Sequence, residues 1–192
     1  MSEFFDHVTP ELAGFIRAQL VFFVATAAPE GRINLSPKGM DTFRVLDKKR
    51  VGYLDLTGSG NETAAHLLRD GRITIMFCSF DKNAEIARIY GRGSAIRPDH
   101  SRWPELIVNF PKLPGVRQVM EIRVESAMTS CGYAVPRMRD LTRATPSRST
   151  GSSAVKLRRR STGRLTISAA SMACQPACAR THRGRAAEAR LT

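Results

Sequence analysis

The aromatic residues of this 192-residue chain all lie before position 137, and this distribution limits what each part of the chain can fold into. Residues 1–136 contain 17 Lys or Arg and 15 Asp or Glu, whereas residues 137–192 contain 13 and 2. A highly charged segment without aromatic residues cannot bury enough apolar surface to offset the entropy that it loses on ordering. We therefore expect one folded domain over residues 1–136 and a basic, disordered tail over residues 137–192.

The formal net charge of +13 would ordinarily suggest a nucleic-acid partner. Most of this charge lies in the tail, and the domain itself is nearly neutral. We therefore expect no specific nucleic-acid partner, although charge alone permits nonspecific binding.

Cysteine usage and hydropathy indicate a cytoplasmic protein. The four cysteines form no dense disulfide framework, which fits a reducing compartment. The N-terminus lacks the basic start and the long apolar run of a secretory signal. No stretch approaches the roughly 18 apolar residues of a membrane-spanning helix, so we expect no membrane partner.

Periodicity over residues 1–136 predicts a mainly β domain with short helices. Thr9-Pro10 is a helix start, because a hydroxyl at the N-cap is followed by proline at the first helical position. We expect helices over residues 10–19, 62–68 and 103–109. We expect strands over residues 21–26, 32–36, 51–56, 72–79, 87–95 and 119–128. Six short strands with mostly short connections indicate a small barrel rather than a parallel α/β sheet.

The segment Thr57-Gly58-Ser59-Gly60-Asn61-Glu62 joins a predicted strand to a helix N-terminus. Free amides and the helix dipole can bind an anion such as phosphate there, and the glycines let the backbone approach it closely. Ser59-x-x-Glu62 is also the pattern of a capping box, which needs no ligand. These residues alone leave both interpretations open.

The segment Asn34-Leu35-Ser36-Pro37-Lys38-Gly39 places a hydroxyl and an ammonium group at the end of another predicted strand. This position suits contact with a phosphate or with the edge of a flavin ring. The alternative is a solvated lysine in a turn, which is the commoner situation for a single Lys.

Several stretches together carry a resemblance to a known family: FFVATAAPEGRINLSPKGMDTFRVLD, VGYLDLTGSGNETAAHLLRDGRITIMFCSF, RIYGRG and SCGYAVP. In this order they resemble the pyridoxamine 5'-phosphate oxidase-like family of FMN-binding split-barrel proteins, over nearly all of residues 10–136. The resemblance implies a six-stranded split β-barrel of the FMN-binding type. It also implies a homodimer that binds FMN at the subunit interface.

The same resemblance assigns cofactor-binding residues by position. Ser36 and Lys38 follow the strand that faces the flavin in such proteins, and Thr57, Ser59 and Asn61 match the turn that holds the FMN phosphate. In the true pyridoxamine phosphate oxidases this turn carries an Arg-Lys pair, whereas here it continues with Glu62. An acidic residue there weakens a phosphate site, so the chain is closer to the broad branch of the family than to those oxidases.

The function implied by the resemblance is that of an FMN-dependent oxidoreductase acting on a small molecule of unknown identity. We assign no catalytic residue, because the flavin itself carries the hydride chemistry. His7, His66 and His100 share no metal-ligand spacing, so we expect no metal site. One alternative is a protein that binds flavin, deazaflavin or haem without turnover. Another is a basic protein that binds nucleic acid through its tail.

The tail after Pro136 departs from the family, whose members commonly continue with Arg-Asp-Thr-Leu and end near Ser-Ile-Asp-Gly-Leu-Pro. Codons compatible with residues 143–147 and 169–176 yield these two motifs when both are translated in one shifted phase. We therefore hypothesise that a frameshift near codons 136–138 replaced the family's C-terminus. The nucleotide sequence of the gene tests this, because a shifted frame that lacks the motifs or contains stop codons would contradict it.

Overall fold

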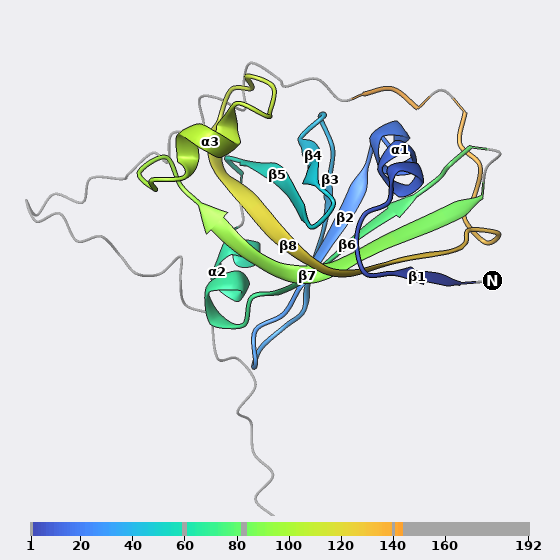
Figure 1. Cartoon of the computed structure of the whole chain (residues 1–192), viewed down its shortest axis with the longest axis horizontal. Coiled ribbons are helices and arrows are strands. Elements are labelled where there is room, and N and C mark those ends of the chain that lie inside the picture. Colours follow the sequence, from blue (N-terminus) through green and yellow to red (C-terminus); the bar gives the residue numbers. More distant parts are fainter. Residues whose placement is uncertain (1, 59–60, 82–83, 140, 144–192) are drawn as a thin grey trace, which may run out of the picture. The chain divides into compact units, whose positions relative to one another are not determined.

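An antiparallel sheet of eight strands forms the body of the described chain (Figure 1). The computed structural model describes residues 2–58, 61–81, 84–139 and 141–143. The strands are β1 (Glu3–Phe5), β2 (Phe22–Thr26), β3 (Asn34–Lys38), β4 (Phe43–Asp47), β5 (Arg50–Leu56), β6 (Arg72–Cys78), β7 (Glu85–Ile96) and β8 (Val116–Cys131). The helices are α1 (Pro10–Ala18), α2 (Glu62–Arg69) and α3 (Trp103–Ile107). Of the predicted tail, the structure describes residues 137–139 and 141–143. The rest of the tail, with nearly all of the residues on which the frameshift hypothesis rests, lies outside the described ranges.

The strand order confirms the predicted split barrel. Among the described residues the sheet follows the path β3-β2-β6-β7-β8-β5-β4, and β1 pairs with β8 outside this path. The strands β3 and β4 lie at the two ends of the path, so the sheet is not closed into a complete barrel. Every strand pair is antiparallel, as expected for a barrel built from short connections.

All six predicted strands are present, and the structure adds two that the sequence did not predict. β1 has only three residues and pairs with the distant end of β8, where Phe4 lies opposite Met128. β4 pairs with β5 across a register shift between Val45 and Asp47. Both strands form because another part of the chain offers an edge for pairing, which is a tertiary rather than a local signal.

Aromatic rings fill the inner face of the sheet. Phe22 lies edge-on to Phe43 and to Tyr53, with ring centroids 5.2 and 5.5 Å apart. Phe43 also lies edge-on to Phe77 at 4.9 Å. Edge-to-face contacts of this kind stabilise a core beyond the area that they bury. A second, smaller apolar cluster lies on the opposite face of β5, where α3 contributes the buried Leu106.

The longest pairing in the sheet joins β7 to β8, and it contains a bulge. The register shifts between Tyr90 and Gly91, so that Glu125 has no residue directly opposite. Such a bulge bends the strand and increases its twist. The two strands are the long bent arrows that cross the front of Figure 1.

None of the helices in the described ranges is long and apolar enough to cross a membrane.

Candidate functional site

One face of β3 carries three polar side chains. Asn34, Ser36 and Lys38 are partly buried, whereas Leu35 and Pro37 between them are exposed. Successive side chains of a strand point to opposite faces, so the three polar residues share one face. The Ser36 hydroxyl donates a hydrogen bond to Asn34 Oδ1 at 3.1 Å. The structure therefore places the two predicted residues of this strand, Ser36 and Lys38, side by side.

A buried carboxylate, that of Asp55 on β5, lies at the Lys38 end of this row. The Asp55 side chain is 7% exposed, and Lys38 Nζ lies 3.6 Å from its Oδ1. Arg117 Nε lies 3.9 Å from Asp55 Oδ2, and Gln118 Nε2 donates to the same oxygen at 2.9 Å. A buried carboxylate is tolerated when it is paired and hydrogen-bonded. Asp55 thus holds the Lys38 ammonium at the end of β3.

Asn61 joins the same group of residues. The Gln118 amide that donates to Asp55 also donates to Asn61 Oδ1, at 2.9 Å. Asn61 is the N-cap residue of α2, and its side chain makes no capping hydrogen bond. A capping box would require Ser59 at the N-cap, where the structure has Asn61. The Asn61 side chain does not cap the first-turn amides of α2, and amides at a helix N-terminus can contact an anion.

Of the remaining two predicted residues, the structure describes Thr57, which directly follows β5. The Thr57 amide donates to the Gly115 carbonyl at 2.7 Å, and Arg117 Nη2 donates to the Gly58 carbonyl at 3.3 Å. The start of β8 therefore holds the turn in place. Within the described ranges, no hydrogen bond joins Thr57 to Lys38. Ser59 lies outside the described residues.

A second polar network connects the β3 face to α2. Asn34 Nδ2 donates to Thr63 Oγ1 at 3.1 Å, and Thr26 Oγ1 lies 3.1 Å from His66 Nδ1. Both threonines are buried. The contact with Thr26 gives His66 a structural role within this network.

In the part of the chain that the structure describes, no three His, Cys, Asp or Glu residues are grouped so that they could hold a metal ion.

The Tyr53 hydroxyl is a buried polar group without a hydrogen bond among the described residues. Burial raises the pKa of the Tyr53 phenol far above its ordinary value, and the charge of Asp55 adds to this effect. The phenol therefore stays protonated in the folded protein.

Tyr53→Phe is expected to leave the free energy of unfolding unchanged or to raise it by about 1 kcal/mol, because the variant removes a buried unsatisfied hydroxyl. Above pH about 10 the unfolded chain loses the Tyr53 proton and the folded protein keeps it, so the wild type loses stability as the pH rises. Tyr53→Phe lacks this loss. Urea unfolding at neutral and alkaline pH measures both effects. Tyr133→Phe, at a side chain 90% exposed, is the matched control; equal alkaline slopes in all three proteins would contradict the prediction.

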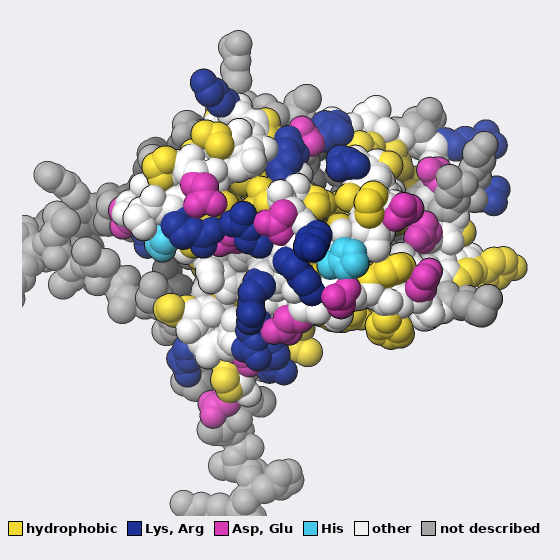
Figure 2. Space-filling model, viewed as in Figure 1, with side chains coloured by type: hydrophobic (Ala, Val, Ile, Leu, Met, Phe, Trp, Pro, Cys, Tyr) yellow, Lys and Arg dark blue, Asp and Glu magenta, His cyan; other side chains and the backbone are white. Residues whose placement is uncertain are grey.

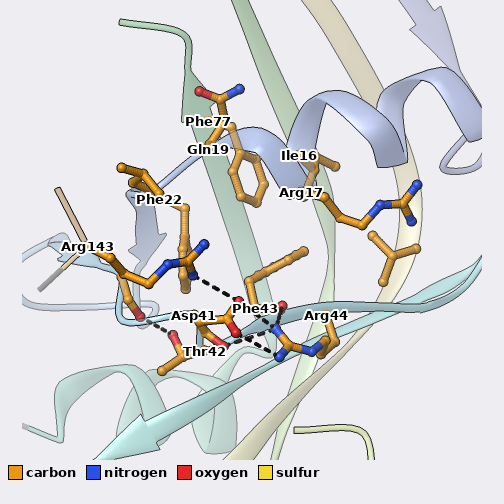
Figure 3. A pocket seen from close by; sticks show the side chains of 13 residues that line it. Ile16, Arg17, Gln19, Phe22, Asp41, Thr42, Phe43, Arg44, Phe77 and Arg143 are labelled. Atoms are coloured by element: carbon orange, nitrogen blue, oxygen red, sulfur yellow. Dashed lines mark hydrogen bonds and ion pairs between the residues drawn. The ribbon is translucent and has the colours of Figure 1, made fainter. Parts of the chain in front are cut away.

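A cavity of about 260 Å³ lies beside the turn that follows Lys38 (Figure 3). Its apolar wall includes Ile16, Phe22, Phe43 and Phe77. Its polar side is organised by Asp41: Arg44 Nη1 lies 3.1 Å and Arg143 Nη1 3.0 Å from Asp41 Oδ1. The hydrogen bond from Arg44 lowers the pKa of Asp41, and the charges of both arginines add to it. The cavity therefore combines an aromatic wall with fixed charges.

Sequence reasoning missed Asp55, Gln118 and Arg117. One signal was available for Asp55, because a carboxylate within the apolar strand Val51–Leu56 must find a partner when it is buried. No comparable signal marked Gln118, which lies 63 positions from the carboxylate that it contacts. Only the pairing of β5 with β8, in which Asp55 lies opposite Gln118, brings these residues together.

Sequence comparisons relate the chain to one family. The family model described as pyridoxamine 5'-phosphate oxidase matches residues 8–131. The pyridoxamine 5'-phosphate oxidase family protein ustO of Aspergillus flavus is 39% identical to this chain over 147 residues. The match covers 74% of this chain and 59% of that protein, so the chain spans less than two thirds of the length of this relative.

Solved structures share the fold at low sequence identity. A candidate pyridoxamine 5'-phosphate oxidase from Lactobacillus delbrueckii has a TM-score of 0.51 and 18% identity, over 64% of this chain and 94% of its own. A variant of HupZ from Group A Streptococcus has a TM-score of 0.50 and 22% identity, over 64% of this chain and 99% of its own. These likenesses concern the fold and not the chemistry of the site.

Proposed function

Because this chain belongs to the pyridoxamine 5'-phosphate oxidase family, we propose that it binds FMN and acts as an FMN-dependent oxidoreductase. The observation that carries the proposal is the meeting of Lys38 and Asn61 around the buried pair of Asp55 and Gln118, at the N-terminus of α2. Ser36 lies next to Lys38 on the same face of β3.

The residues at this place fit a phosphate group. Two cationic side chains, Lys38 at 3.6 Å and Arg117 at 3.9 Å, lie beside the single buried carboxylate of Asp55. The helix α2 has eight residues, and its N-terminal amides and dipole favour an anion. We assign Lys38, the turn at Thr57 and Ser59, and Asn61 to the phosphate, and Ser36 to the adjoining part of the flavin. Glu62 is exposed, so solvent screens its opposing charge.

We also propose that the FMN site lies at the interface of a homodimer. The side chains of Ile33 and Leu35 are 77% and 65% exposed next to the proposed site. They belong to the segment that contains β3, which ends the path of strands. Exposed apolar residues on an edge strand are unusual unless another chain covers them. Sedimentation of the purified protein at micromolar concentration tests this, and a monomer would contradict it.

When bound, FMN supplies the hydride chemistry, and the protein contributes binding and orientation. Lys38 and the α2 amides hold the phosphate and so fix the position of the ring. We propose that the cavity beside Asp41 receives the organic substrate, because it joins an aromatic wall to the fixed charges of Asp41 and Arg44. An aromatic wall of this kind excludes water from the reacting groups.

Titration of the protein with FMN and with riboflavin tests the function. We expect saturable quenching of FMN fluorescence, and binding of riboflavin about tenfold weaker or more, because riboflavin lacks the phosphate. Equal affinities would contradict the phosphate assignment, and the absence of saturable binding would contradict the function. Reduction of the bound flavin by NADPH then distinguishes the oxidoreductase from a flavin-binding protein without turnover.

A further inference from the structure

Four arginines from four neighbouring strands lie in one row on the outer face of the sheet. The strand register pairs Arg72 of β6 with Arg92 of β7. It also pairs Arg123 of β8 with Arg92 on one side and with Arg50 of β5 on the other. Directly opposed residues have Cβ atoms about 4.5–5.5 Å apart, and like charges at this spacing destabilise a sheet. The four arginine side chains lie outside the apolar core, so core packing does not account for their placement opposite one another.

Carboxylates neutralise only part of this row. Arg72 pairs with Asp70 at 2.6 Å and Arg92 with Glu125 at 3.4 Å. Arg50 pairs with Asp47 at 2.7 Å, Glu105 at 3.4 Å and Glu121 at 3.5 Å. The side chain of Arg123 is exposed and makes no ion pair or hydrogen bond with any residue that the structure describes. The uncompensated charge therefore lies in the middle of the row, between two other guanidinium groups.

A groove of about 380 Å³ opens over Arg123, and five of its eight lining residues are Lys or Arg. Two of the lining residues are acidic. One of them, Glu121, is paired with Arg102, which donates a hydrogen bond of 2.7 Å to each of its carboxylate oxygens. Figure 2 shows the gathering of Lys and Arg side chains on this face of the molecule. Lys49, Arg50, Arg92 and Arg102 each have a carboxylate partner, so Arg123 supplies the unpaired positive charge among the described residues that line this concave space.

We propose that this groove binds a small phosphoanion, with Arg123 as the principal donor. The planar guanidinium group donates two parallel hydrogen bonds to phosphate oxygens, and a phosphate placed there relieves the repulsion within the row. The volume suits a compact phosphorylated molecule. Lys49 from the β4–β5 turn and Arg102 before α3 line the groove, and this concave form favours a compact ligand over the extended backbone of a nucleic acid.

The groove and the proposed flavin site are separate. Arg50 and Asp55 are both on β5 and are separated by an odd number of positions, so their side chains lie on opposite faces of the strand. Ligand binding at Arg123 is therefore measurable without FMN, and the failure of one proposal leaves the other intact.

Calorimetric titration of the full chain with pyrophosphate tests the proposal. We expect Arg123→Gln to weaken pyrophosphate binding by about tenfold or more, because it removes a charge-assisted pair of hydrogen bonds. Arg123→Lys keeps the charge without the planar fork, and we expect intermediate affinity. Arg69→Gln is the matched control, since Arg69 is exposed on α2 and does not line the groove. The basic tail is present in all four proteins and contributes equally.

A second measurement guards against a merely structural effect. Without ligand and at low salt, Arg123→Gln is expected to raise the melting temperature, because it relieves repulsion and breaks no ion pair. A lower melting temperature would overturn the proposal, as would equal loss of pyrophosphate affinity in Arg69→Gln. Binding of a short DNA duplex more tightly than pyrophosphate, in an Arg123-dependent way, would overturn the assignment to a small ligand. FMN affinity is expected to be unchanged in Arg123→Gln.

Discussion

Replacement of Gly91 by alanine is expected to lower the free energy of unfolding by about 3 kcal/mol, because the new methyl group meets backbone rather than a movable side chain. A Cβ atom at Gly91 would lie 2.1 Å from the Arg123 carbonyl oxygen and 3.0 Å from Ile122 Cγ2. Relief of this clash requires β7 and β8 to separate at the bulge, within the longest pairing of the sheet. Separation of β7 and β8 would also displace their neighbours in the sheet, β6 and β5.

Thermal unfolding measures this effect, and the expected fall in melting temperature is roughly 10 °C. Gly14→Ala is the matched control: a Cβ at this helical position meets nothing within 4 Å. Since alanine in a helix is favoured over glycine by roughly 0.5–1 kcal/mol, Gly14→Ala should be slightly stabilising. If the Gly91→Ala protein melts within about 2 °C of the wild type, the described geometry of the bulge is wrong.

Lys38→Ala is expected to weaken FMN binding by about tenfold to a hundredfold, the value of one charge-assisted hydrogen bond to a phosphate. Lys38 is the ammonium group of the proposed site, and its position is fixed by Asp55 at 3.6 Å. The Asp55 carboxylate keeps Gln118 and Arg117 as partners in the variant, so the fold should survive. Fluorescence titration with FMN gives the affinity, and circular dichroism confirms that the variant is folded.

Two further variants separate a specific contact from general charge. Lys38→Arg should recover most of the affinity, because the positive charge is retained near the same carboxylate. Lys112→Ala removes a lysine that is exposed in the loop before β8, and it should bind FMN as the wild type does. Unchanged FMN affinity in Lys38→Ala would remove Lys38 from the site. Riboflavin affinity should respond little to any of these changes, since riboflavin carries no phosphate.

Local sequence patterns predicted most of the fold. The six predicted strands were found because alternation, turn residues and β-branched composition are properties of short segments. The polar row of Asn34, Ser36 and Lys38 was visible for the same reason, since every second residue of a strand shares a face. By contrast, β1 and β4 carry little local signal and form only by pairing with β8 and β5.

The uneven distribution of aromatic residues and charge was determined by the sequence alone, and so was the expectation of one domain ending near Pro136. Only the tertiary structure decided which polar groups meet: Asp55 with Lys38, Gln118 with Asn61, and the four arginines in one row. The physical reason is strand register. A shift of one residue moves every side chain of a strand to the opposite face, and the sequence of a single strand does not fix its register against a distant partner.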